Sequence, residues 1–582
     1  MISLATFKSG SALALMAAAL VTTLAGCGAS SAAAPGGSVR SQGITHPHGT
    51  VVVALPVQTS PNWYFPVYSA PDFTSTNEQV DALMFKPLLD VTKHNTIDYN
   101  RSLVNHITAN NGDTVFTLRM NPKYHWSNGK PVSAQDVVFT WDIMKAASAN
   151  NPHLPFSYGG AGTGGVPSDW KSVTAVNAST VRITLTKGVN PDWFIRNGLG
   201  QVNPVPEAVW NRYPHNMMQE LKYINGLANS PRNAAYGVVD GPYKLQSYTA
   251  NQQWVFIPNS RYSGHQSSIA KLVFEYETSS ASEFTALKTG AVSVGYIPMS
   301  LWTSRQALSG FNVTSGYQWG MTYLQLNFNS NAPGHINKLF DNLYIRQALD
   351  MGINQPAIVK QLYHGQGIEA NGPVPSKPST PFFDKALNHL TYPYNPAAGR
   401  ALLERHGWKM THGVMTKNGQ KLAFSINYIT GSTTGTNLMQ YLATSWANEG
   451  IKVSLIPTPG SQFPLPNNKW DTIFTGLTSW VYSPDFYPTG GGLFKTGSAL
   501  NFWGYSNSAM NRLVNLTYAP YTTQAQEQQR MNAYQAFASK QLPLLFLPYG
   551  ASFYVSSKHL HGFRSTLNLI SGLITPNYWS VH

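Results

Sequence analysis

The sequence predicts an α/β fold, and three observations indicate it. Helical and strand patterns alternate along most of the 582 residues, which is typical of helices layered on sheets. Hydrophobic residues make up 42% of the chain, so large cores can be buried, and the length corresponds to roughly three or four domain-sized units. No segment after residue 26 is apolar enough to cross a bilayer, which takes ~20 apolar residues.

The first 26 residues are typical of a secretion signal. Lys8 is followed by an apolar run over 12–24, which is too short for a membrane span. The run ends in Leu-Ala-Gly-Cys, with Cys27 last, and this tetrapeptide resembles the bacterial lipoprotein signal. We therefore expect residues 1–26 to be a signal peptide and Cys27 to carry a lipid such as palmitate.

A flexible linker follows the lipidated cysteine. Residues 27–48 are rich in Gly, Ser and Ala, with too little apolar surface to fold. A coil of this kind spans ~20 to 25 Å, which places a folded body close to the membrane surface. Because Cys27 is the only cysteine, the chain has no intramolecular disulfide.

The folded body begins with an expected strand over 50–55, where β-branched residues follow the linker. A helix is expected over 77–89 and a strand over 114–118. Ser133 is a candidate N-cap with Asp136 at the capping-box position of the next helix. Further helices are expected over 282–289, 345–351, 396–406, 437–448 and 525–539, and further strands over 180–185, 272–276, 323–328, 424–428 and 452–456.

The charge balance argues against nucleic acid as a partner. The formal charge is +14, but charged residues are only 11% of the chain, against a usual ~25%, and no Lys/Arg-rich run occurs. The excess arises because the chain has only 25 Asp and Glu residues. Acid unfolding comes mostly from native carboxylates with depressed pKa values, so we expect stability to stay nearly flat from about pH 7 to about pH 3 and the protein to work in an acidic medium.

Residues 115–145 resemble the signature of the family 5 solute-binding proteins, the extracellular receptors of ABC importers for peptides, nickel and some sugars. The matching residues are Phe116, Leu118, Arg119, Trp126, Gly129, Ala134, Asp136 and Val137. Further blocks of the family pattern follow in order at 241–248, 258–262, 286–294, 324–329, 341–354, 394–408, 541–549 and 561–563. Asp136 has the spacing of a helix cap, so we interpret the signature as architecture rather than as a binding site.

The resemblance implies a two-lobed, type II periplasmic-binding-protein-like clamshell with an extra N-terminal subdomain. Lobe I is expected to combine 49–75, 190–315 and 546–582, with the subdomain at 76–189 and lobe II at 316–545. We expect the hinge crossings near 316–324 and 545–549. The implied function is capture of oligopeptides or dipeptides and delivery to an ABC permease and its ATPase subunits, by a monomer without a cofactor, lipid-anchored outside the cell membrane or in a periplasm.

The loop over 475–494 is the segment expected to select the ligand. In peptide-binding relatives an Asp ahead of an acidic-Pro pair receives the peptide ammonium, and here Trp480 stands at that position. Asp485 could substitute from a shifted position, whereas Trp480 and Tyr482 could offer ring faces to a cation or a stacking floor. The candidate ligand contacts are Trp480, Tyr482, Asp485 and Thr478 from this loop, with Trp63 and Phe65 from the other lobe.

Catalytic and metal-binding patterns are absent from the sequence. There is no G-x-S-x-G elbow, H-E-x-x-H helix or P-loop. The histidine pairs His46/His48 and His559/His561 lack the further ligands that a metal site needs. We expect no enzymatic activity; a nickel or metal-chelate receptor, a tethered hydrolase and a surface sensor remain the alternatives.

Overall fold

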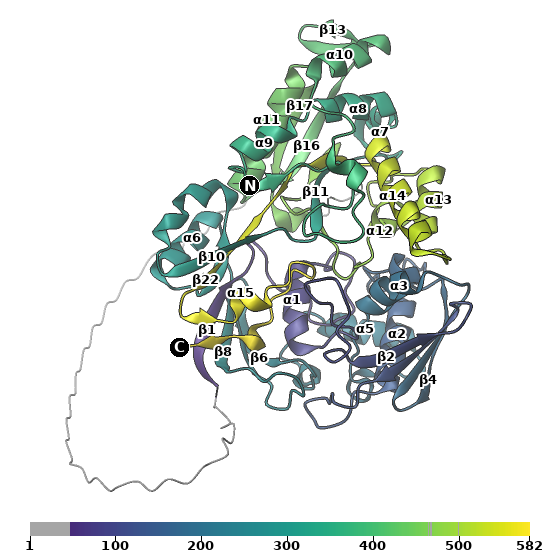
Figure 1. The fold of residues 1–582 in the computed structure, drawn as a ribbon, viewed down its shortest axis with the longest axis vertical. Coiled ribbons are helices and arrows are strands. Elements are labelled where there is room, and N and C mark those ends of the chain that lie inside the picture. The colour runs from purple at the N-terminus through teal and green to yellow at the C-terminus, as the bar shows by residue number, and fades with distance from the viewer. Residues whose placement is uncertain (1–46, 464, 466–467, 499) are drawn as a thin grey trace, which may run out of the picture. The chain divides into compact units, whose positions relative to one another are not determined.

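The computed structural model describes residues 47–582 except 464, 466–467 and 499 (Figure 1). The expected signal peptide, Cys27, His46 and nearly all of the linker lie outside the described residues, so the lipoprotein interpretation stays a prediction. None of the helices described is both long enough and apolar enough to pass through a bilayer.

A seven-stranded sheet organises the first large core. Its strand order is β10-β22-β9-β1-β8-β7-β6, with β1 central and parallel to both β8 and β9. The β-branched residues at Val51 and Val53 are buried in β1, which explains why this segment forms an inner strand. The strands are β1 (His48–Ala54), β6 (Tyr243–Thr249), β7 (Gln253–Pro258), β8 (Ile269–Glu275), β9 (Val294–Ile297), β10 (Phe311–Gly316) and β22 (Ser552–Ser557).

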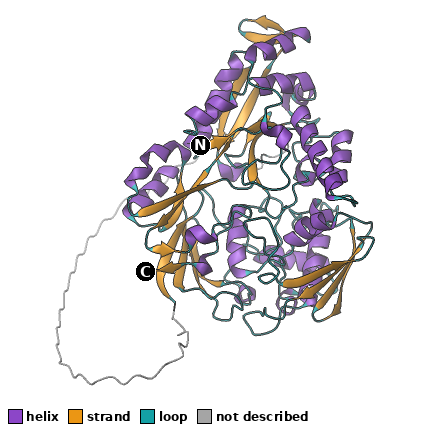
Figure 2. Ribbon diagram, in the orientation of Figure 1, coloured by secondary structure: helices purple, strands orange, loops and turns teal. Residues whose placement is uncertain are grey.

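A second large core surrounds a six-stranded sheet with the order β17-β16-β18-β11-β19 and β20 also paired to β11. All seven residues of β11 are buried. Helix α11 (Thr433–Ala447) packs on β16 and β17, and Figure 2 shows these strands flanked by helices. The strands are β11 (Gly320–Leu326), β16 (Ala423–Ile429), β17 (Lys452–Thr458), β18 (Thr472–Phe474), β19 (Trp480–Val481) and β20 (Leu545–Leu547).

The chain passes between the two large sheets at two places. It leaves the seven-stranded sheet at Gly316, the end of β10, and enters the six-stranded sheet at Gly320, the start of β11. It returns between Leu547 of β20 and Ser552 of β22. These are the two segments at which the hinge crossings were expected; the complete domain division stays a prediction.

The family-like signature forms a strand-turn-helix unit on a four-stranded antiparallel sheet, ordered β2-β3-β5-β4. Ser133 and Asp136 form the capping box of α2 (Ala134–Ala147), and the Asp136 carboxylate also accepts hydrogen bonds from Trp126 Nε1 at 3.1 Å and Glu207 N at 2.8 Å. The architectural interpretation of Asp136 is confirmed. The strands are β2 (Val104–Ala109), β3 (Val115–Met120), β4 (Trp170–Asn177) and β5 (Thr180–Leu185).

The remaining elements are short strands and helices around these sheets. The minor strands are β12 (Gly367–Ile368), β13 (Lys409–Thr411), β14 (Val414–Lys417), β15 (Gln420–Lys421), β21 (Tyr549–Gly550), β23 (Leu560–His561) and β24 (Ser580–Val581). The other α-helices are α1 (Ser75–Met84), α3 (Pro191–Trp193), α4 (Glu207–Trp210), α5 (Met217–Leu227), α6 (Ser280–Thr289), α7 (Asn337–Phe340), α8 (Leu343–Met351), α9 (Gln355–Gln361), α10 (Pro396–Arg405), α12 (Gly491–Phe494), α13 (Ser508–Thr517), α14 (Gln524–Gln541) and α15 (Phe563–Thr566).

Two expected helix boundaries differ from the structure for local reasons. Helix α1 ends at Met84 rather than at residue 89, because Pro87 disfavours helical geometry at the residue before it. Helix α6 begins after Ser279, which caps Ser282 N, so Ser282 is the third helical residue and not the start.

Carboxyl groups are buried in this fold more often than they are paired. Only Asp90, Asp169 and Asp192 form ion pairs among the described residues. Loss of hydration on burial is the main cause of raised carboxyl pKa values. The pKa is raised to about 8 for Glu78, Asp240, Glu283 and Asp350, to about 9 for Glu449 and to about 7 for Asp485.

These shifts predict that the protein becomes more stable as the medium is acidified from pH 8 to about pH 5. A carboxyl with a folded pKa above its unfolded value near 4 holds an extra proton in the folded state between those two pH values. Its contribution is complete below the unfolded pKa and is lost as pH rises through the folded pKa. We expect the free energy of unfolding, from denaturant titration, to be larger at pH 5 than at pH 8 by at least about 3 kcal/mol.

This expectation replaces the flat profile inferred from the carboxylate count alone. Asp350→Asn and Glu283→Gln should each flatten the pH dependence, because they remove one raised carboxyl. A free energy of unfolding that falls steadily from pH 8 to pH 5 would contradict the prediction.

Candidate functional site

Two cavities are candidate ligand sites, and the smaller one touches both segments that connect the large sheets, at Gly320 and Tyr549. The larger, of about 370 Å³, is walled by α1 and the segment after it, by residues 200–203 and 565–578, and by Ser483, Pro484 and Phe486 of the ligand loop. The smaller, of about 340 Å³, is walled by 367–376, Gly320, Met321 and Tyr549. Both volumes fall within or near the range of small-ligand pockets, ~300 to 1,000 Å³.

Strand β11 fixes the position of the ligand loop. Met321 and Trp480 face each other across the antiparallel β11–β19 pair, and Ser479 N donates to Met321 O at 3.0 Å. Trp480 is half-buried, and its Nε1 is buried without a hydrogen-bond partner among the described residues. Thr478, two residues earlier, is exposed. The loop therefore contains a half-buried Trp480 whose Nε1–H group makes no hydrogen bond to a described residue.

Tyr482 and Asp485 lie deeper. Tyr482 is fully buried, donates its hydroxyl to Pro373 O and packs on Trp319 with ring centroids 4.9 Å apart. Asp485 is 5% exposed, and Oδ1 has no hydrogen-bond partner among the described residues. Burial raises the pKa of Asp485 to about 7. Tyr482 is a packing residue in this structure, whereas Asp485 keeps an unused acceptor.

The two candidates from the other lobe are also packed into the core. Trp63 Nε1 donates to Phe65 O at 2.8 Å, and its ring meets Phe156 edge to face at 5.1 Å. Phe65 is fully buried against Trp210 at 4.8 Å. This packing explains why an aromatic run over residues 62–66 follows the inner strand β1. None of the six candidate side chains is part of the wall of either cavity.

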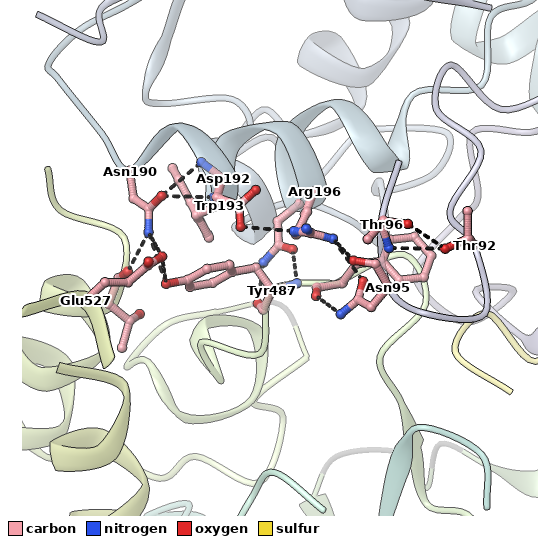
Figure 3. A network of polar contacts seen from close by, with 12 residues as sticks. Thr92, Asn95, Thr96, Asn190, Asp192, Trp193, Arg196, Tyr487 and Glu527 are labelled. Carbon is pink, nitrogen blue, oxygen red and sulfur yellow. Dashed lines mark hydrogen bonds and ion pairs between the residues drawn. The ribbon is translucent and has the colours of Figure 1, made fainter. Parts of the chain in front are cut away.

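A network of polar contacts joins Asn95 and residues 190–197 to the ligand loop and α14 (Figure 3). Asn190 Nδ2 donates to Tyr487 Oη at 3.0 Å and to Glu527 Oε1 at 2.9 Å, and Tyr487 Oη donates to Glu527 Oε1 at 2.6 Å. Asn197 forms two 2.7 Å hydrogen bonds with the backbone of Tyr487, one to its carbonyl and one from its amide.

The same network continues through an arginine. Arg196 Nε donates to Asp192 Oδ2 at 3.2 Å, while Nη1 donates to the carbonyl and side-chain oxygens of Asn95 at 2.5 and 3.0 Å. Asn95 Nδ2 in turn donates to Phe486 O at 3.2 Å (Figure 3). These contacts hold the loop residues that wall the larger cavity against residues 95–197.

Sequence reasoning missed this network and the charged walls of the larger cavity. The only local signal for Asn190 was an Asn-Pro pair, which indicates a helix N-cap, and its acceptor does cap Asp192 N. Within the described residues, no group of three or more His, Cys, Asp or Glu side chains is gathered as a metal site would require.

Two sheet-centred parts joined by two chain crossings are the arrangement of the type II periplasmic binding protein fold. The chain belongs to the bacterial extracellular solute-binding proteins, family 5, whose middle-region sequence profile matches residues 100–493. That region contains most of the blocks on which the resemblance was based.

Individual relatives are distant. The oligopeptide-binding protein AppA of Bacillus subtilis is 20% identical over 470 residues, covering 80% of each chain. A provisionally named ABC transporter peptide-binding protein of Brucella suis is 25% identical over 289 residues, and the match spans about half of each chain, 50% of this one and 48% of the relative.

Solved structures share the fold over nearly the whole chain. AppA of Bacillus subtilis with a nonapeptide has a TM-score of 0.76 at 18% identity, covering 92% of this chain and 100% of AppA. NikZ of Campylobacter jejuni with Ni(L-His) has a TM-score of 0.73 at 20% identity, covering 91% and 99%. Similarity at this level establishes the fold.

We predict that Tyr487→Phe loosens the contact in Figure 3 without unfolding the protein. The change removes the hydroxyl that donates to Glu527 and accepts from Asn190, and a hydrogen bond to a charged group contributes about 1.5–3 kcal/mol. Hydrogen exchange at the amides of Asp192, Trp193 and Tyr487 should accelerate by roughly tenfold.

Tyr441→Phe is the matched control, because its hydroxyl makes no hydrogen bond among the described residues and it lies on α11. Equal exchange rates at these amides in wild type and Tyr487→Phe would show that the hydroxyl contributes nothing to the contact.

Proposed function

We propose that this protein is the extracellular substrate-binding component of an ABC importer, capturing oligopeptides or dipeptides and delivering them to a permease and its ATPase subunits. The observation that carries the proposal is the family match over residues 100–493, together with relatives named as peptide-binding proteins. The family is one of solute-binding proteins, and the proposed chemistry is binding without bond-making.

Closure of the two lobes is the proposed mechanism. Rotation about two crossing segments is the ordinary way in which such lobes close on a ligand. A ligand shifts this equilibrium only by the difference in its affinity for the closed and open states, so it must contact both lobes. The lining of the larger cavity supports this proposal, because Ser483, Pro484 and Phe486 of the expected lobe II share it with α1 and residues 565–578.

The tether completes the proposal. A lipid on Cys27 and a linker of Gly, Ser and Ala residues would keep the folded body near the membrane in which a permease lies. The protein would then act as a lipid-anchored monomer on the outer face of the cell membrane, or in a periplasm where an outer membrane is present.

A nickel or metal-chelate receptor is the second candidate. Trp480 stands where peptide-binding relatives place their ammonium-binding Asp, and NikZ with Ni(L-His) shares the fold. A chelate carries its own ligand set and could be held by aromatic and polar walls without a metal-ligating cluster on the protein.

Calorimetry separates the two candidates. We expect saturable binding of mixed peptides of two to five residues by the purified soluble body, because an extended backbone offers strand-like hydrogen bonds that tolerate different side chains. Ni(L-His) is the comparison ligand. Absence of peptide binding together with binding of the nickel chelate would replace the peptide proposal by the chelate one.

Trp480 gives a residue-level prediction. If its half-buried ring and unused Nε1–H serve the ligand, Trp480→Ala should weaken binding by about 1–3 kcal/mol and leave the melting temperature of the ligand-free protein nearly unchanged. Phe502→Ala, which removes an aromatic that is 38% exposed and lies outside the ligand loop over 475–494, is the control. Unchanged affinity with a large fall in melting temperature would instead assign Trp480 to the core.

A further inference from the structure

The larger cavity has two separate groups of ionisable side chains in its walls. Glu78 of α1 lines the cavity with Tyr68 and Tyr158, and Asp81, which lies behind the wall, is one helical turn further on, at the i+3 position. The second group contains Lys86, Asp90 and Arg101, with Lys93 and His94 beside them. No hydrogen bond or ion pair among the described residues joins one group to the other.

The first group is acidic and has no cationic partner. No described residue donates a hydrogen bond to the Glu78 carboxylate, and both carboxylate oxygens of Asp81, which is 1% exposed, lack partners. Loss of hydration raises the pKa of Glu78 to about 8 and the pKa of Asp81 well above its ordinary value. Glu78 lines the cavity, so its carboxylate is the acceptor that a ligand donating hydrogen bonds would meet.

The second group is basic. Lys86 Nζ and Arg101 Nε both contact the same oxygen of Asp90, at 3.5 and 3.2 Å, so two cations share one carboxylate. Arg101 is partly exposed, with its guanidinium 5.0 Å from the Tyr578 ring centroid. Asp240 accepts a hydrogen bond from the Lys86 backbone amide at 2.9 Å, and burial raises the pKa of Asp240 to about 8. The free donors of a guanidinium match the geometry of a carboxylate.

We propose that the larger cavity binds a small zwitterionic ligand, with its ammonium at Glu78 and its carboxylate at Arg101. The inference rests on the proposed function and narrows its ligand class to molecules with both termini free, of which a dipeptide is the probe. The cavity volume of about 370 Å³ suits a ligand of this size and not a long peptide lying wholly inside it.

Binding of an ammonium should also displace a proton. The titratable groups around Glu78 are Asp81 on the same helix and the hydroxyls of Tyr68 and Tyr158, and none of them is a cation. A bound cation beside Glu78 favours its charged form, so the carboxyl should lose its proton as the ligand binds.

The test is calorimetry with a dipeptide, its N-acetyl form and its C-terminal amide, against wild type, Glu78→Gln and Arg101→Gln. Asp350→Asn is the matched control, because Asp350 is a buried carboxyl with a pKa of about 8 outside both cavity walls. We expect N-acetylation to weaken binding to wild type by about tenfold or more, and to cost far less in Glu78→Gln. Amidation of the C-terminus should likewise weaken binding to wild type by about tenfold or more and cost far less affinity in Arg101→Gln.

Titrations at pH 7 in two buffers of different ionisation enthalpy give an independent readout. Wild type and Asp350→Asn should release close to one proton per dipeptide, and Glu78→Gln should release almost none. If dipeptides bind but blocking either terminus costs nothing in wild type, the assignment of this cavity is overturned while the proposed function stands. If no peptide binds to wild type at all, both fail.

Discussion

The double crossing of the chain between its two large sheets is the constraint on which the rest of the structure depends. Strand β11 follows β10 after only three residues, and its fully buried length pairs with β19 at Gly320–Met321, with β20 at Thr322–Leu324 and with β18 at Gln325–Leu326. One strand therefore positions the returning crossing and the ligand loop together. Any rotation of one sheet against the other must be absorbed by the few residues between β10 and β11 and between β20 and β22.

Hydrogen bonds join the ligand loop to residues 95–197, and a stack of Trp193 on Tyr518, with ring centroids 4.6 Å apart, lies beside them. Hydrogen bonds such as those of Asn190 with Glu527 and of Asn197 with Tyr487 exchange with bonds to water on opening, so their net contribution is small. The contact can select one geometry for the closed state and still leave the ligand to decide which state is populated.

The sequence predicted the helices and strands whose signals are local, and missed features that depend on tertiary contacts. Ser133 and Asp136 predicted the start of α2, and a run of β-branched residues predicted β1. Both predictions were possible because caps and inner strands are specified by neighbouring residues. From the sequence, Trp63, Phe65 and Tyr482 could each have been a ligand contact or a core residue. Only their packing in the folded protein distinguishes these two roles. Glu78 and Asp81 have no local sequence signal that sets them apart from other helix residues, and only the fold places Glu78 in a cavity wall and buries Asp81 without partners.

The distribution of charge between the two sides of the larger cavity has a consequence for the order of events. Ser483, Pro484 and Phe486 contribute no charge, whereas Glu78, Asp90 and Arg101 all belong to the opposite wall. On the proposed assignment, a ligand would first exchange its hydration for charged partners on that wall, while the cleft is still open to water. Ser483, Pro484 and Phe486 would then cover a ligand whose ionic groups are already satisfied, so closure would not have to desolvate a charge on these three residues. The expected replacement of an acid by Trp480 agrees with that division, because the loop would then contribute area and shape while the ammonium is bound elsewhere.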